Sequence, residues 1–101
     1  MKLIVVMGIE EHTDTLRQLF REHHVPVYSE SPIRGFKQAG EADEAGNWFA
    51  VQHPSIHSQL LFTFVDDVKG AELMRGIRKH REQGASGNPI RAFLLNVEDH
   101  V

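Results

Sequence analysis

Short apolar runs recur along this chain, and their length and composition predict strands. Each run is rich in β-branched or aromatic residues and is too brief for a helix. The runs cover residues 2–7, 60–65 and 90–97. We expect Gly8 to end the first of them. A further extended segment, residues 25–35, contains Pro32, and we place it at a sheet edge because proline cannot donate a hydrogen bond to a neighbouring strand.

A helix is predicted over residues 11–23, after the first run. Three apolar residues recur there at spacings of three and four among charged and polar residues, which is typical of a helix with one buried stripe. They are Leu16, Leu19 and Phe20. We expect Thr13 or Thr15 to cap the start of this helix.

A second amphipathic helix is predicted over residues 68–83. Asp66 and Asp67 precede it and are suited to cap its first turn. Basic residues occupy its last turns, where they complement the negative end of the helix dipole. They are Lys79, His80 and Arg81. Gly84 is expected to close the helix.

These elements follow one another in the order βαββαβ, without a linker that would separate two domains. The chain has 101 residues, of which 41% are hydrophobic and 25% are charged, so we expect one globular domain spanning residues 1–101. The same numbers exclude a repeat array or a disordered tail. The order predicts an α+β ferredoxin-like sandwich, in which a four-stranded antiparallel sheet carries both helices on one face.

The central strands carry a further signal. A sheet with helices on one face and water on the other should alternate apolar and polar residues. Residues 3–7 and 60–65 are apolar at almost every position instead. Central strands that are simply more apolar than others would explain this pattern. We favour a homo-oligomer in which further copies cover the second face.

Composition excludes several classes of function. The chain has no cysteine, which rules out disulfides, thiolate metal sites and cysteine nucleophiles, and fits a cytoplasmic protein. The formal net charge of −3 argues against a broad surface for nucleic acid or for anionic membranes. The sequence contains no apolar stretch of 18 residues, the length needed to span a membrane. Any site for an anion must therefore be local.

Three segments, together with the helix predicted after the first of them, resemble the PII nitrogen-regulatory signalling superfamily over nearly the whole chain. The segments are residues 1–6 (MKLIVV), 25–38 (VPVYSESPIRGFKQ) and 90–98 (IRAFLLNVE). The most specific match is residues 34–38 (RGFKQ), which is similar to the family's basic residue, Gly and Phe followed by a basic residue and Gln. On this resemblance the chain is a divergent, PII-like member of the superfamily.

The resemblance implies a homotrimer whose sheets pack around a central axis, with ligand-binding clefts between neighbouring subunits. It also implies a regulatory protein and not an enzyme. A long loop, here residues 37–53, would contact a protein target such as a transporter or an enzyme. The ligand would be an adenine nucleotide or another small anionic metabolite.

The sequence departs from the family pattern in three places. The loop is shorter and lacks the family's tyrosine, since the one tyrosine is Tyr28. Residues 88–91 (NPIR) stand where the family has a Gly-Asp-Gly-Lys phosphate loop. Of that loop only the basic residue has a counterpart here, Arg91. The chain stops at Val101, before the segment that supplies further arginines in the family. These departures favour a smaller, weaker or different ligand.

Seven residues are candidate ligand contacts. They are Gly35, Phe36, Lys37, Gln38, Gly87, Asn88 and Arg91. Glycine lets backbone amides approach an anion, a basic side chain supplies charge, and glutamine can read a base or a carboxylate. From spacing alone, a strand end with a turn also explains residues 35–38, and a helix end with a turn also explains residues 84–87.

Histidine is unusually frequent, with seven residues, and His53 and His57 are the best metal candidates. Neutral imidazole binds Zn²⁺, Ni²⁺ or Cu²⁺. Pro54 argues against the helix that would direct both rings at one ion. Further ligands would come from Gln52, His23 or His24, or from a neighbouring subunit. Surface histidines explain the same residues. A metal-responsive trimer is therefore an alternative function.

An enzyme is a further alternative. Ferredoxin-like chains of this length also pair as dimeric barrels, in which a lone His or Tyr acts on a small organic substrate. No acid–base pair supports that chemistry, because Asp66 and Asp67 are explained as helix caps. The two hypotheses differ in assembly. The barrel predicts a dimer with an internal pocket, and the PII-like hypothesis predicts a trimer with clefts between subunits.

Overall fold

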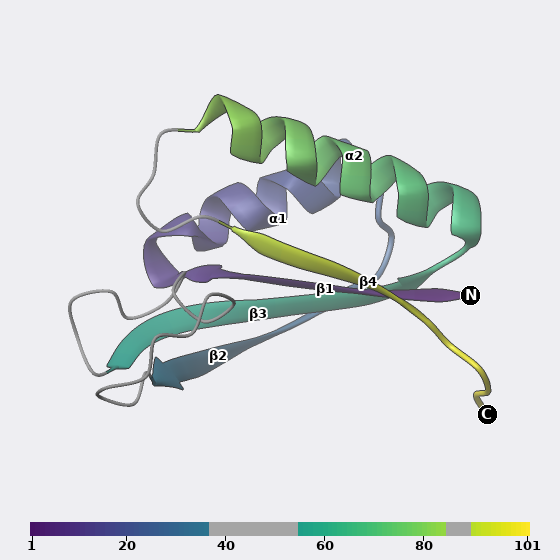
Figure 1. Ribbon diagram of the computed structural model, residues 1–101, viewed down its shortest axis with the longest axis horizontal. Coiled ribbons are helices and arrows are strands. Elements are labelled where there is room, and N and C mark those ends of the chain that lie inside the picture. Colours follow the sequence, from purple (N-terminus) through teal and green to yellow (C-terminus); the bar gives the residue numbers. More distant parts are fainter. Residues whose placement is uncertain (37–54, 85–89) are drawn as a thin grey trace.

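A computed structural model describes residues 1–36, 55–84 and 90–101 of the chain (Figure 1). These described residues form four strands, two α-helices and one 3₁₀ turn. The elements are β1 (Lys2–Ile9), the 3₁₀ turn η1 (Glu10–His12), α1 (Thr13–Glu22), β2 (Ser29–Phe36), β3 (Ser55–Val65), α2 (Asp67–Gln83) and β4 (Arg91–Asn96). Their order is the predicted βαββαβ.

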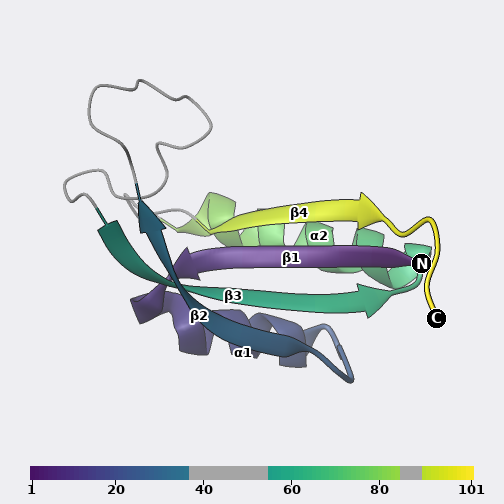
Figure 2. The ribbon, with the colours of Figure 1, turned by 90° about the horizontal axis from the view of Figure 1, so that it is seen from below.

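The four strands form one antiparallel sheet in the order β2-β3-β1-β4. Both helices lie side by side on one face of it (Figures 1 and 2). This arrangement confirms the predicted ferredoxin-like α+β sandwich. It also confirms that the segment with Pro32 is an edge strand, since β2 pairs with β3 alone among the described strands.

Three strand boundaries differ from the predicted ones by two residues or more. The prediction that Gly8 ends the first strand is wrong, because Gly8 pairs with Gln59 and β1 continues to Ile9. β3 begins at Ser55, five residues before the predicted start, because this part of the strand pairs with the end of β2. β2 itself begins at Ser29, four residues after the predicted start. Pairing between strands thus overrides the local apolar pattern at these ends.

The start of α2 follows the prediction. Asp66 is the N-cap, and its carboxylate accepts a hydrogen bond of 2.7 Å from the backbone N–H of Lys69. The N-terminal ammonium group lies 3.8 Å from the Asp67 carboxylate at the same end. Gly84 is the C-cap, as predicted.

The start of α1 does not follow the prediction, whereas its last residue, Glu22, lies one residue before the predicted end. The N-cap is His12, without a side-chain hydrogen bond, and the hydroxyl of Thr13 donates to the carbonyl of Glu10 at 2.7 Å instead. At the other end His24 adopts a left-handed φ of 55°, a conformation that glycine usually supplies after a helix. The N–H of Val25 then donates to the carbonyl of Phe20 at 3.0 Å, which turns the chain sharply towards β2.

The core lies between the sheet and the two helices. Six side chains in it are fully buried: Ile4, Val6 and Leu61 from the sheet and Leu16, Phe20 and Leu73 from the helices. The ring of Phe20 meets the ring of Tyr28 edge to face, with 5.0 Å between centroids. This core is complete within one protomer, because sheet and helices bury each other's apolar faces.

An ion pair connects α1 to the edge strand β2. The guanidinium of Arg17 forms a forked pair with the Glu30 carboxylate, in which Nε donates to Oε2 at 2.9 Å and Nη2 donates to Oε1. The hydrogen bond and the positive charge of Arg17 lower the pKa of Glu30. The same hydrogen bond and the charge of Glu30 raise the pKa of Arg17.

Candidate functional site

The helix-free face of the sheet is apolar, although it lies opposite the core. Ile4 and Val6 of β1 point to the helices, so Leu3, Val5 and Met7 lie on the other face. The register carries this assignment to the neighbouring strands. We call the apolar residues of this side the open face: Leu3, Val5, Met7, Ile33, Ile56, Leu60, Phe62, Phe64, Phe93 and Leu95.

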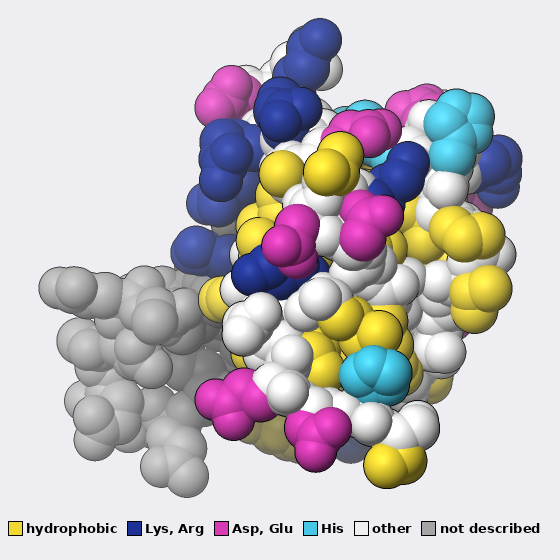
Figure 3. Space-filling model, turned by 90° about the vertical axis from the view of Figure 1, so that its right-hand side faces the viewer, with side chains coloured by type: hydrophobic (Ala, Val, Ile, Leu, Met, Phe, Trp, Pro, Cys, Tyr) yellow, Lys and Arg dark blue, Asp and Glu magenta, His cyan; other side chains and the backbone are white. Residues whose placement is uncertain are grey.

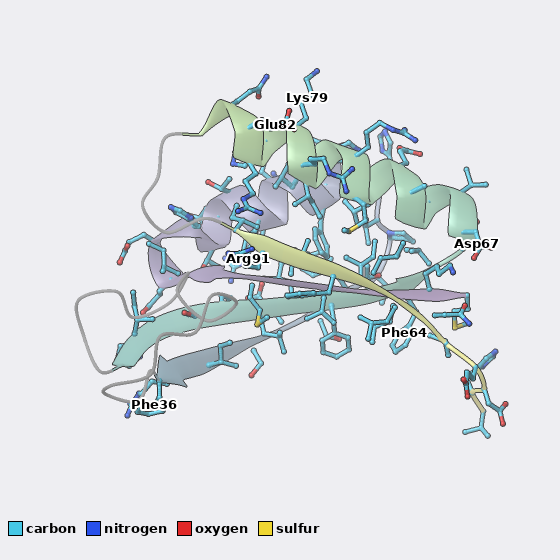
Figure 4. All side chains as sticks on the ribbon, in the orientation of Figure 1. Phe36, Phe64, Asp67, Lys79, Glu82 and Arg91 are labelled. Carbon is cyan, nitrogen blue, oxygen red and sulfur yellow. The ribbon has the colours of Figure 1, made fainter. Side chains whose placement is uncertain are left out.

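Several large side chains of the open face reach solvent. Phe64 is 54% exposed, Phe93 47% and Leu95 45%. Figure 4 shows Phe64 on the side of the sheet away from the helices. Its ring meets that of Phe62 edge to face, 6.3 Å between centroids, so the two rings form a continuous apolar ridge. A contiguous apolar surface of this kind marks an interaction site in soluble proteins.

Gly35, Phe36 and Arg91, the described candidate ligand residues, lie at one end of the sheet. β2 ends there with Gly35 and Phe36, and β4 begins there with Arg91 (Figure 2). Gly35 pairs with Ile56 and Arg91 pairs with Met7, which places both on the open face. Phe36 is 67% exposed.

Within one protomer, however, these candidates occupy opposite edges. β2 and β4 are separated by β3 and β1, which is three strand spacings or about 14 Å. No small anion can bridge that distance. The remaining candidates, Lys37, Gln38, Gly87 and Asn88, and the predicted partner-binding loop at 37–53, lie outside the described residues.

The structure places one of the two metal candidates. His57 is exposed on β3 and pairs with Arg34 of β2, whereas His53 lies outside the described residues. Within residues 1–36, 55–84 and 90–101, no three metal-ligating side chains come together. The described part of the chain therefore holds no assembled metal site within one protomer.

A groove that the sequence analysis did not single out lies on the other side of β4. It runs between α2 and β4 and has a volume of about 110 Å³. Its lining residues, which we call the α2–β4 groove, are Met74, Ile77, Arg78, Arg81, Ile90 and Ala92. The four from α2 are spaced three and four apart, so they form one stripe of the helix. This spacing is the signal by which the sequence could have revealed Arg78 and Arg81 as a pair.

The α2–β4 groove lies in the most basic part of α2. Between residues 74 and 83 the helix carries four basic residues, Arg75, Arg78, Lys79 and Arg81, and one acidic residue, Glu82. All four are exposed. In Figure 3 Lys and Arg side chains gather on the upper part of the surface, where α2 lies. Figure 4 shows Lys79 and Glu82 on the outer side of the helix, away from the sheet.

Among the described residues, no helix has both the length and the apolar composition needed to span a membrane.

The fold is similar to that of a solved structure, a protein from Thermus thermophilus that is provisionally described as a PII-like signaling protein. The TM-score is 0.63 and the identity is 15%, over 95% of this chain and 85% of the other. No known protein family and no curated protein matches the sequence. At this identity the similarity shows the PII-like, ferredoxin-like fold.

Proposed function

We propose that this chain is a PII-like regulatory protein of the cytoplasm. It acts as a homotrimer that binds a small anionic metabolite, or a nucleotide, in clefts between its subunits. It is a binding protein and not an enzyme. The PII-like fold of the Thermus thermophilus neighbour supports this class of protein, and the open face supports the assembly.

The apolar open face is the observation that carries the proposal. Phe64, Phe93 and Leu95 are about half exposed in one protomer, and burying them removes apolar surface from water. Each Å² so buried contributes about 25 cal/mol. Packing the open faces of several copies around a common axis buries all of them together.

Assembly also explains the position of the candidate ligand residues. Gly35 and Arg91 lie at one end of the sheet but on opposite edges. When the β2 edge of one copy approaches the β4 edge of the next, the backbone around Gly35 comes near the guanidinium of Arg91. An anion in that cleft contacts two subunits, with charge from Arg91 and backbone contacts from the end of β2.

Residues 37–53 follow directly on the end of β2, so a ligand bound at Gly35 and Phe36 acts on the start of this segment. A ligand with a higher affinity for one arrangement of the segment shifts its population. The segment thereby presents a different surface to a protein target, such as a transporter or an enzyme.

Isothermal titration calorimetry with ATP, ADP and inorganic phosphate tests the anion site. The variant Arg91→Ala should weaken binding by about tenfold or more, the usual effect of losing one charge-assisted contact. Arg21→Ala removes the same charge from the exposed surface of α1 and serves as the matched control. Equal affinities of Arg91→Ala and the wild type, at unchanged subunit number, would reject the role of Arg91.

A further inference from the structure

The α2–β4 groove is separate from the cleft proposed above. Ile90 and Ala92 line it from the helix side of β4, whereas Arg91 between them lies on the open face. Arg91 is not among its lining residues, so the groove does not use the side chain on which the proposed cleft depends.

The α2–β4 groove combines an apolar floor with two positive charges at its rim. Ile77 and Ile90 are buried, and Met74 and Ala92 pack against the core. Arg78 and Arg81 are exposed above them, and the described part of the chain shows no ion pair for either. Basic residues near a helix end complement its dipole, but dipole compensation does not require two arginines over an apolar hollow.

The balance of charge favours an anion in this groove. The C-terminal end of a helix carries about half a negative charge, and two guanidinium groups exceed it roughly fourfold. The one acidic residue in this part of α2, Glu82, lies with Lys79 on the outer side of the helix (Figure 4). The chain as a whole has a net charge of −3, so this basic stripe is a local feature and not a consequence of composition.

We propose that the α2–β4 groove binds a phosphate monoester with a small aliphatic group. The phosphoryl group, which carries about −1.5 to −2 charges at neutral pH, matches the two guanidinium forks of Arg78 and Arg81. The aliphatic group lies on the apolar floor. The groove has a volume of about 110 Å³, is open to solvent and has a floor of largely buried side chains, so it suits only a small aliphatic group.

Titration of the ¹⁵N-labelled protein with isopropyl phosphate, followed by NMR, tests this proposal. The amides of Ile77 and Ala92 should shift, and 2-propanol at the same concentrations should not shift them. Arg78→Gln and Arg81→Gln should each weaken binding by about tenfold. Arg78→Lys keeps the charge but not the fork, and should give an intermediate loss.

Arg75→Gln is the matched control, because it removes the same charge from α2 outside the groove-lining stripe. It should change the affinity less than twofold. An equal loss in Arg75→Gln and Arg78→Gln would mean general attraction to a basic helix and would overturn the site. Equal affinity for inorganic phosphate and isopropyl phosphate would overturn the role of the apolar floor.

Discussion

The two faces of the sheet are built from the same strands and are almost equally apolar, yet one is complete and the other is not. Ile4 and Thr63 pair on the covered face and are buried, whereas their neighbours Leu3 and Phe64 pair on the open face, where Phe64 is 54% exposed. α1 and α2 pack on the covered face and bury its apolar side chains. The open face has the composition of a core but no covering layer within the described protomer, which is the reason for proposing further copies.

A cavity in the covered face should have the largest effect. Phe20→Ala removes a fully buried ring between α1 and the sheet and should lower the free energy of unfolding by about 3–5 kcal/mol. Urea denaturation measures this free energy of unfolding. Phe36→Ala, at a position that is 67% exposed, is the matched control and should cost less than about 0.5 kcal/mol. Similar losses in both variants would contradict the assignment of the core.

A charge on the open face should break the assembly with less effect on the protomer itself. Phe64→Asp places a carboxylate where the proposed trimer buries a ring, and burying an unpaired charge is strongly unfavourable. Sedimentation velocity should show protomers of 11.5 kDa. Val68→Asp changes an apolar residue on α2 that is 78% exposed, and should leave the assembly intact. Dissociation of both variants, or of neither, would argue against the open face as the interface.

Removing the N-cap of α2 should have a smaller effect on stability. Asp66→Ala removes the carboxylate that caps α2 and should lower the free energy of unfolding by about 1 kcal/mol. Asp99→Ala, beyond the last strand, is the control and should leave the free energy nearly unchanged. The oligomer should persist in both variants, because neither touches the open face. If Asp66→Ala were no less stable than Asp99→Ala, the capping bond would have no role.

The ion pair between α1 and β2 should give the smallest effect, seen as a pH dependence. Arg17 lowers the pKa of Glu30, so the pair stabilises the fold above the ordinary pKa of a glutamate, about 4.3. That contribution is lost as the pH falls through the lowered pKa of the folded state. Glu30→Gln should therefore lose less stability between pH 6 and pH 3 than the wild type. Arg17→Gln should flatten the profile in the same way, and an unchanged profile in either variant would contradict the pairing.

Much of the fold could be predicted because its signals are local. Apolar runs locate the strands, and Asp66 and Gly84 mark the ends of α2 correctly. The start of α1 could not be predicted, because its N-cap is His12, which makes no side-chain hydrogen bond, and neither Thr13 nor Thr15 caps the helix. The extra length of β3 also escaped prediction, since it depends on pairing with β2.

Of the candidate sites, too, some are visible in the sequence and others form only on folding. The open face follows from the sequence, since two-sided apolar strands are visible in residues 3–7 and 60–65. The α2–β4 groove does not. The spacing of Arg78 and Arg81 on the helix is visible in the sequence, but the apolar floor forms only where α2 packs beside Ile90 and Ala92. That Gly35 and Arg91 occupy opposite edges was implied by the predicted fold, whose central strands are residues 3–7 and 60–65, and the strand order confirms it.

Sedimentation equilibrium of the wild-type protein at micromolar concentration measures whether further copies cover the open face. A homotrimer with its open faces turned towards one another should give a mass of three chains. A dimer would favour the barrel hypothesis instead. A stable single chain would show that the open face tolerates water, and would contradict both the proposed assembly and the clefts that depend on it.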